Sequence, residues 1–327
     1  MNFTNTSELG MLDNDTRNVT KVIFSLTACL ALIGNILVLL LFFRFPTWLK
    51  RAHNQCILSL AVTDILTAIS LLVVPKFVQD ADSYQVPSNY VARETYCRIV
   101  WSHFIPFSLG ITSVYTCLVM AIERWFAVLR PLQYKQTFSV RTMRFLIFCS
   151  WLAGFAFETP VIPRVVGFEG TQDSAPGCKW TVEASKTKSW TLAIVLFAGQ
   201  TFIPCSLMVF AYSNIMLRFR SEKEFLVSTR QSLASANSTS SRDLILRRAT
   251  AMMAMATLAL ILCWMPNQIY FLLAQLGYLE LKPSIPVRMF GALAFFNCCM
   301  NPIIYGFMNE KFRRGYRRLL IPCSEAN

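Results

Sequence analysis

The sequence predicts an all-α membrane protein: a seven-transmembrane helix bundle with a short amphipathic interfacial helix after the seventh span. The first reason is composition, since the chain is 54% hydrophobic and 15% charged, whereas soluble domains contain about 25% charged residues. The second is the presence of seven apolar runs long enough to cross a hydrocarbon core of about 30 Å, which takes roughly 20 helical residues. The third is the sorting of basic residues between the two sides of these runs.

The seven apolar runs divide the chain into three parts. They are Val22–Phe43, Gln55–Pro75, Ile99–Ile122, Phe145–Pro163, Ser189–Leu217, Ala249–Leu279 and Met289–Asn309. We therefore expect an outer tail at 1–20, a seven-transmembrane domain at 21–308 and a terminal segment at 309–327. Asp64 and Glu158 are the only acids inside the runs, which marks both as candidates for a functional or a structural polar contact.

An odd number of spans places the two termini on opposite sides of the membrane. With the N-terminus outside, the inward segments carry 20 Lys and Arg against 6 Asp and Glu, and the outward segments carry 11 against 11. This asymmetry is the positive-inside pattern. It accounts for the net charge of +13 without a nucleic-acid partner. It also predicts a multi-pass protein of the plasma membrane with an extracellular N-terminus, whose surroundings are the lipid bilayer.

The two terminal segments have different chemistry. The tail at 1–20 is polar and contains four N-glycosylation acceptor patterns, at Asn2, Asn5, Asn14 and Asn18, so we expect an extracellular glycosylated tail. The segment at 309–327 places Phe312 and Tyr316 on one helical face and basic residues on the other, which predicts an amphipathic helix followed by a short cytoplasmic tail. Cys323 is either a palmitoylation site or a plain cytosolic thiol.

Asp64 is a costly residue in the second run, because a charge in the middle of a bilayer needs polar partners inside the bundle. Candidate partners at similar depth are Asn35, Ser113, Asn297 and Asn301. The cluster is a structural hydrogen-bond network, and its hard oxygen ligands also suit a sodium ion at Asp64, Ser113, Asn297 and Asn301. An allosteric sodium ion is the one cofactor that we expect.

The cysteines and prolines carry further predictions. Most of the 11 cysteines lie inside the apolar runs, and only Cys97 and Cys178 lie in outward, oxidising positions, so we expect a disulfide bond between them. Prolines within runs five, six and seven, at Pro204, Pro266 and Pro302, predict bent helices in a bundle that can pivot.

These motifs together resemble the rhodopsin-like class of G-protein-coupled receptors. The matching residues are Gly34-Asn35, the stretch from Leu60 to Asp64, Glu123-Arg124-Trp125 with Pro131-Leu132, Trp151, Pro204 with Tyr212, the stretch from Cys263 to Pro266, and the stretch from Asn301 to Tyr305. They follow the order and spacing of the class from about residue 22 to 321. A chain of this class is not an enzyme, and we expect no catalytic residue.

The resemblance implies that an agonist drives an outward swing of span six, which opens a cytoplasmic cleft for a heterotrimeric G protein, and that arrestin is a further partner. Arg124 is held by Glu123 at rest and turns toward Tyr212 and Tyr305 on activation. The residues that it assigns to coupling and activation are Glu123, Arg124, Tyr212, Trp264, Pro266, Asn301, Pro302 and Tyr305. One departure matters here: many relatives place an acid at the foot of span six to hold the arginine, and this chain has Leu246.

The ligand is less constrained than the class. The segment from Asn309 to Arg314 is similar to that of neuropeptide receptors, which favours a peptide with a basic or amidated end. The expected contacts are Glu158, Gln200, Asn267, Gln268, Phe271 and Phe295. A receptor for a lipid or other small molecule stays open as an alternative. Retinal and amine ligands are disfavoured, since Met289–Asn309 has no lysine and Pro106 stands where an amine-pairing acid is expected. A channel or transporter is disfavoured by the lack of an inverted repeat.

Overall fold

The computed structural model describes residues 6–80, 84–170, 176–181, 186–229, 239–279 and 285–320. The α-helices are α1 (Thr6–Arg44), α2 (Ala52–Val73), α3 (Tyr90–Thr95), α4 (Phe104–Leu129), α5 (Pro131–Thr137), α6 (Val140–Glu158), α7 (Lys186–Phe197), α8 (Ile203–Thr229), α9 (Thr239–Gln275), α10 (Ile285–Met308) and α11 (Glu310–Leu320). Short 3-10 or π-helical segments are η1 (Pro46–Lys50), η3 (Tyr96–Trp101), η4 (Thr159–Arg164) and η5 (Ala198–Phe202). Two strands, β1 (Val165–Phe168) and β2 (Gly177–Trp180), form a hairpin.

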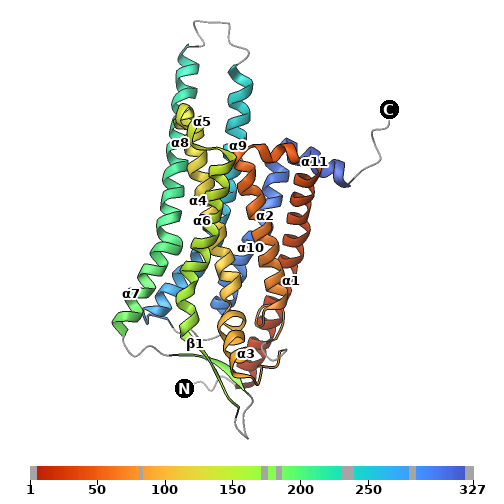
Figure 1. Ribbon diagram of the computed structural model, residues 1–327, viewed down its shortest axis with the longest axis vertical. Helices are drawn as coiled ribbons and strands as arrows, with labels where there is room; N and C mark the ends of the chain where they lie inside the picture. Colours follow the sequence, from red (N-terminus) through yellow and green to blue (C-terminus); the bar gives the residue numbers. More distant parts are fainter. Residues whose placement is uncertain are drawn as a thin grey trace.

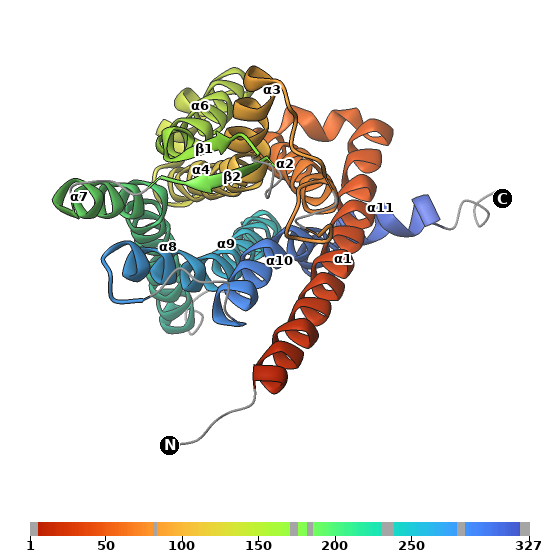
Figure 2. The ribbon, with the colours of Figure 1, turned by 90° about the horizontal axis from the view of Figure 1, so that it is seen from below.

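Seven helical segments within the described residues are long and apolar enough to cross a membrane, which confirms the predicted fold class. Figure 1 shows them as one elongated bundle, with the β-hairpin and α3 at one end and α11 lying across the other. Seen from the hairpin end, the helices form a ring, and the first turns of α1 lean away from it (Figure 2). α1 runs without a break through the expected boundary at residue 20.

The outward faces of the helices are apolar, as a lipid environment requires. On α6, Phe145, Phe148 and Leu152 lie on one helical face and are each at least 60% exposed. Water would disfavour a patch of this kind, whereas lipid tails do not. The polar residues of the spans, including Asp64 and Asn301, are buried instead within the bundle. This inside-out distribution is that of a membrane-spanning bundle.

The helices α2 and α9 both end earlier than the apolar runs predicted. α2 ends at Val73 and not at Pro75, because the residue before a proline disfavours the helical region; Val74 is extended, with ψ of 134°. α9 ends at Gln275 and not at Leu279. Gly277 has φ of 85° and caps the helix there, a conformation that glycine adopts without a steric penalty.

The third span is not one continuous α-helix. The predicted run Ile99–Ile122 includes the π-helical segment η3, and His103 adopts a left-handed conformation, with φ of 63°, just before α4 begins. Nε2 of His103 donates to the carbonyl oxygen of Pro75 at 3.2 Å. Its ring lies 4.8 Å from that of Phe77. These contacts fix the break against the end of α2, a feature that hydropathy alone does not report.

The β-hairpin is attached to the outer end of the third span. The disulfide between Cys97 and Cys178 is present, as predicted, and joins η3 to β2. Arg93 of α3 forms an ion pair with Glu169 at 2.9 Å. A carboxylate oxygen of Glu94 accepts a hydrogen bond from the backbone N–H of Gly167 at 2.9 Å. A disulfide bond, an ion pair and a hydrogen bond therefore attach the hairpin segment to the outer end of the third span.

Candidate functional site

The outer half of the bundle contains an aromatic cluster centred on Phe107 of α4. Its ring centroid lies 5.5 Å from that of Phe295, 6.3 Å from that of Phe271 and 6.3 Å from that of Trp264. Such tilted and edge-on arrangements are favourable for aromatic rings. The structure thus brings two predicted ligand contacts, Phe271 and Phe295, against one side chain. Phe107 was not predicted, because nothing in its apolar run distinguishes it from the other phenylalanines.

Two amide side chains of α9, those of Asn267 and Gln268, lie within one helical turn before Phe271 and are buried. Asn267 is 4% exposed and Gln268 is 8% exposed. Among the described residues, Nδ2 of Asn267 has no hydrogen-bond partner. A buried donor without a partner costs free energy, so an acceptor supplied from outside the chain would be bound favourably there.

Glu158 and Gln200 meet where α6 approaches η5. Nε2 of Gln200 donates to the carbonyl oxygen of Phe157 at 3.0 Å and lies 3.5 Å from Oε2 of Glu158. Glu158 is buried. Within the described part of the chain, no hydrogen bond joins this pair to the aromatic cluster. The six predicted ligand contacts therefore form two groups, one aromatic with amides and one acidic.

Three acids at the outer end of the bundle, Asp80, Glu94 and Glu169, form ion pairs. Asp80 forms an ion pair with Lys21 at 2.6 Å, and the hydrogen bond from Lys21 holds the pKa of Asp80 below its ordinary value. Glu94 pairs with Arg98 at 2.8 Å. Together with the pairing of Glu169, this leaves none of these three acids as a free charge that would attract a basic ligand. Asp82, Asp173 and Glu183 lie outside the described residues.

Asp64 lies in the middle of the bundle and is fully buried. Nδ2 of Asn301 donates to Oδ2 of Asp64 at 2.9 Å, which joins α2 to α10. Among the described residues, Oδ1 of Asp64, Oδ1 of Asn297 and Oδ1 of Asn35 have no hydrogen-bond partner. Carboxylate and amide oxygens are the ligands that a hard cation such as sodium prefers. Ser113 is buried, but it makes no hydrogen bond to Asp64 within the described residues.

Arg124 and Glu123 form a charge-assisted, two-pronged hydrogen bond at the inner end of α4. Two residues that the sequence did not single out complete this network. The hydroxyl of Tyr134, on α5, donates to Glu123 at 2.7 Å, and burial, followed by the charge of Glu123, raises the pKa of Tyr134. Nη2 of Arg124 lies 3.3 Å from Nδ1 of His53, on α2. No local sequence signal marks His53, because the contact spans two helices.

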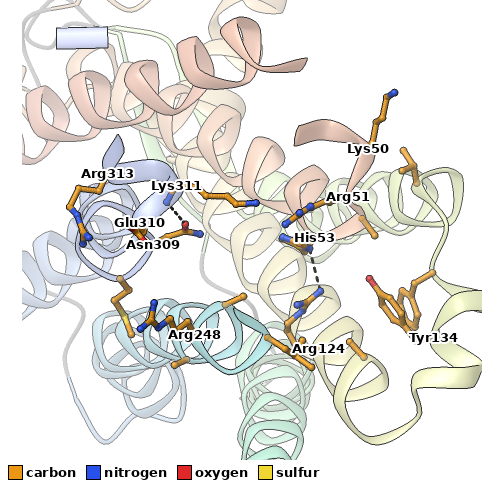
Figure 3. A pocket seen from close by; sticks show the side chains of 18 of the residues that line it. Lys50, Arg51, His53, Arg124, Tyr134, Arg248, Asn309, Glu310, Lys311 and Arg313 are labelled. Atoms are coloured by element: carbon orange, nitrogen blue, oxygen red, sulfur yellow. Dashed lines mark hydrogen bonds between the residues drawn. The ribbon is translucent and has the colours of Figure 1, made fainter. Parts of the chain in front are cut away.

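This network borders a cavity of about 1060 Å³ at the end of the bundle opposite the hairpin, shown in Figure 3. Among the described residues, its lining contains seven Lys and Arg side chains and one acid, Glu310. The basic residues are Lys50, Arg51, Arg124, Arg248, Lys311, Arg313 and Arg314. Burial, and next the charge of Arg51, lowers the pKa of Lys311. The cavity is thus suited to an acidic or polar occupant.

The other predicted activation residues lie between the outer cluster and this cavity. Trp264 is buried, and its indole lies against Gly110 of α4. Pro266 lies inside α9 and Pro302 inside α10. The hydroxyl of Thr257 donates to that of Tyr212 at 3.5 Å.

Tyr305 is buried, and its ring lies 5.4 Å from that of Phe312 of α11. Its hydroxyl has no hydrogen-bond partner among the described residues. A buried hydroxyl without a hydrogen-bond partner is consistent with a side chain that changes partners.

The predicted modification sites are only partly described. Asn18 is exposed on the first turns of α1, and Asn14 lies in the same helix. Asn2, Asn5 and Cys323 lie outside the described residues.

Comparison with known proteins gives two findings. Residues 34–305 match the family described as 7 transmembrane receptor (rhodopsin family). The chain is 27% identical over 314 residues to the RYamide receptor of Drosophila melanogaster, an alignment that covers 89% of this chain and 60% of that relative. The family match runs from the Gly34-Asn35 motif of α1 to Tyr305 of α10, so it includes the Asp64 cluster and the Arg124 network. The chain therefore belongs to the rhodopsin family of seven-transmembrane receptors.

Proposed function

We propose that this chain is a plasma-membrane receptor, with its N-terminus outside, that binds an extracellular peptide and activates a heterotrimeric G protein through movement of α9. The observation that carries this proposal is the Arg124 network beside a basic cavity, at the end of the bundle opposite the disulfide-tied hairpin. Arg124 is paired with Glu123, which is the resting arrangement that the resemblance implied.

The physical basis is a two-state bundle with two binding ends. A ligand that prefers the state with α9 displaced outward raises the population of that state, and a G protein in the cavity does the same. Each partner must then strengthen the binding of the other. Trp264 is the side chain suited to connect the ends, because its ring contacts the outer cluster and it lies two residues before Pro266 in α9.

The proposed ligand is a peptide with a basic or amidated end, in keeping with the similarity of this chain to an RYamide receptor. The rings of Phe271 and Phe295 and the amides Asn267 and Gln268 would receive the amidated end. Glu158, next to Gln200, would receive a basic side chain, since a buried acid with one long hydrogen bond gains from a cation.

We expect Gln268→Ala and Phe271→Ala each to reduce the potency of a peptide agonist by about tenfold, which corresponds to about 1.4 kcal/mol for an anchor contact. The measurement is G-protein activation by RYamide peptides and other amidated peptides in cells with matched surface expression. Phe148→Ala, at a lipid-facing position of α6, is the control. Unchanged potency in both variants, or activation by lipids alone, would contradict the peptide pocket.

We also propose that the Asp64 cluster binds sodium. The parent protein should melt at a higher temperature in sodium than in N-methylglucamine, and Asp64→Asn should lose that difference, because it removes the only full negative charge in the cluster. Thermal unfolding of the purified protein in the two salts measures this without any agonist. An equal sodium effect in parent and variant would show that the cluster is structural only.

Other features of this proposal follow the family. We expect arrestin as a second cytoplasmic partner, no catalytic activity, glycosylation within the tail at 1–20, and palmitoylation at Cys323. Peptide mapping of protein from cultured cells tests the last two.

A further inference from the structure

The contact between His53 and Arg124 joins α2 to α4 at the mouth of the basic cavity. Nη2 of Arg124 lies 3.3 Å from Nδ1 of His53, and Figure 3 shows the two side chains pointing toward each other. A guanidinium group has only donors, so Nδ1 must be the acceptor. The ring is therefore neutral in this contact, with its proton on Nε2.

Glu123, which also accepts hydrogen bonds from Arg124, cannot hold the guanidinium against a second helix. Glu123 is the neighbour of Arg124 in the chain and moves with it as α4 moves. Tyr134 reaches the pair from α5, and its hydroxyl donates to Glu123 at 2.7 Å, so it acts on the acid of the pair. The hydrogen bond to His53 ties the guanidinium of Arg124 directly to α2.

Among the described side chains, α9 contributes to the cavity lining no hydrogen-bond acceptor that could replace His53. The residues that α9 contributes to the cavity lining are Leu246, Arg248, Ala249 and Ala251, and none has a side-chain acceptor for a guanidinium. Arg248 adds a positive charge on that side. Among the described side chains of the lining, α9 therefore gives the resting position of Arg124 no electrostatic support.

We infer that His53 is a positioning residue that restrains Arg124 in the resting state, in place of an acid at the foot of α9. This inference rests on the proposed function, because restraint of Arg124 has a consequence only if its movement permits coupling. Arg124 must leave His53 before it turns toward Tyr212 on α8. Loss of the acceptor on His53 therefore favours the active state.

The first test compares His53→Ala with His53→Asn, since the amide oxygen of Asn occupies about the place of Nδ1 and can still accept a hydrogen bond. The measurement is ligand-free nucleotide exchange on a panel of purified G proteins by the full-length receptor in nanodiscs. We expect His53→Ala to raise exchange about fivefold to tenfold, the scale of one lost hydrogen bond of ordinary net strength. His53→Asn should stay near the parent. Phe148→Ala, at a lipid-facing position of α6 outside the cavity, is the control and should not raise exchange.

The second test restores the restraint from another helix. Leu246→Glu on the His53→Ala background places an acceptor at the foot of α9 and should return exchange toward the parent level. A spin-label pair at Leu132 and Arg248 reports the distance from α5 to α9 without any G protein. His53→Ala should shift its distribution to longer distances, and the double variant should reverse the shift.

The outcomes separate this inference from the proposed function. If Glu123→Ala raises exchange and His53→Ala does not, coupling stands and the role of His53 is wrong. Equal increases in His53→Ala and His53→Asn also overturn it, because the hydrogen bond would then be irrelevant. If no variant activates any G protein, the proposed coupling fails. The spin labels then still test the role of His53. If His53→Ala leaves the distance between positions 132 and 248 unchanged, the restraint of Arg124 by His53 is wrong as well, and if the distance becomes longer, the restraint is supported.

Discussion

Gly154→Ala should destabilise the bundle strongly, although alanine is the better helix former. Gly154 lies on α6 where this helix packs against α4, and an added Cβ would lie 2.1 Å from Oγ1 of Thr112 and 2.6 Å from the carbonyl oxygen of Ser108. The second contact is with backbone, which cannot rotate away. Close helix approach at small residues supports association of membrane helices. The expected loss is about 1–3 kcal/mol, the usual scale of overpacking, and it opens the contact between α4 and α6.

The measurement is the apparent melting temperature of the purified receptor, with Gly291→Ala as the matched control. Gly291 also lies in a membrane-spanning helix, and an added Cβ there meets nothing within 4 Å. The control should therefore be neutral or slightly stabilising, since glycine costs about 1 kcal/mol relative to alanine within a helix. Equal melting temperatures for the two variants would show that α6 can shift away from α4 without cost.

Gly110→Ala should raise ligand-independent G-protein activation several-fold. The added Cβ would lie 2.2 Å from Cη2 of Trp264 and 2.7 Å from its Cζ3, so the indole must move away from α4. Trp264 is buried and belongs to α9, so displacement of its ring presses α9 away from α4. In the proposed mechanism this is the direction of activation. The added methyl group would keep the indole of Trp264 displaced at all times, at the position that an agonist would otherwise influence.

Trp264→Phe on the Gly110→Ala background provides the decisive comparison, because the smaller ring leaves room for the new methyl group. We expect this double variant to return basal exchange toward the level of Trp264→Phe alone, a non-additive result that indicates direct contact. Additive effects of the two substitutions would contradict the contact. Gly291→Ala again serves as the control.

Residues that act through their own local chemistry could be predicted from the sequence. The spans follow from runs of apolar residues, since each segment must satisfy its backbone hydrogen bonds alone in lipid. The pairing of Cys97 with Cys178 followed from topology, because only these two lie on the oxidising side. The Glu123–Arg124 pair joins neighbouring residues and therefore needs no knowledge of packing.

Contacts between helices could not be predicted in this way. The approach of His53 to Arg124 joins residues 71 positions apart, and it depends on how α2 and α4 rotate and cross. The same holds for Phe107 at the centre of the aromatic cluster and for Gly110 beneath Trp264. The break at His103 depends on contacts with the end of α2.

The sequence by itself determined which segments cross the membrane and which family the motifs resemble, and its charge pattern predicted which side faces the cytosol. Only the tertiary structure decided which buried polar and aromatic groups meet. The physical reason is that hydropathy and charge act on each segment independently. Side-chain contacts between helices depend instead on how each helix is rotated about its axis and on how closely side chains pack, within a few ångströms.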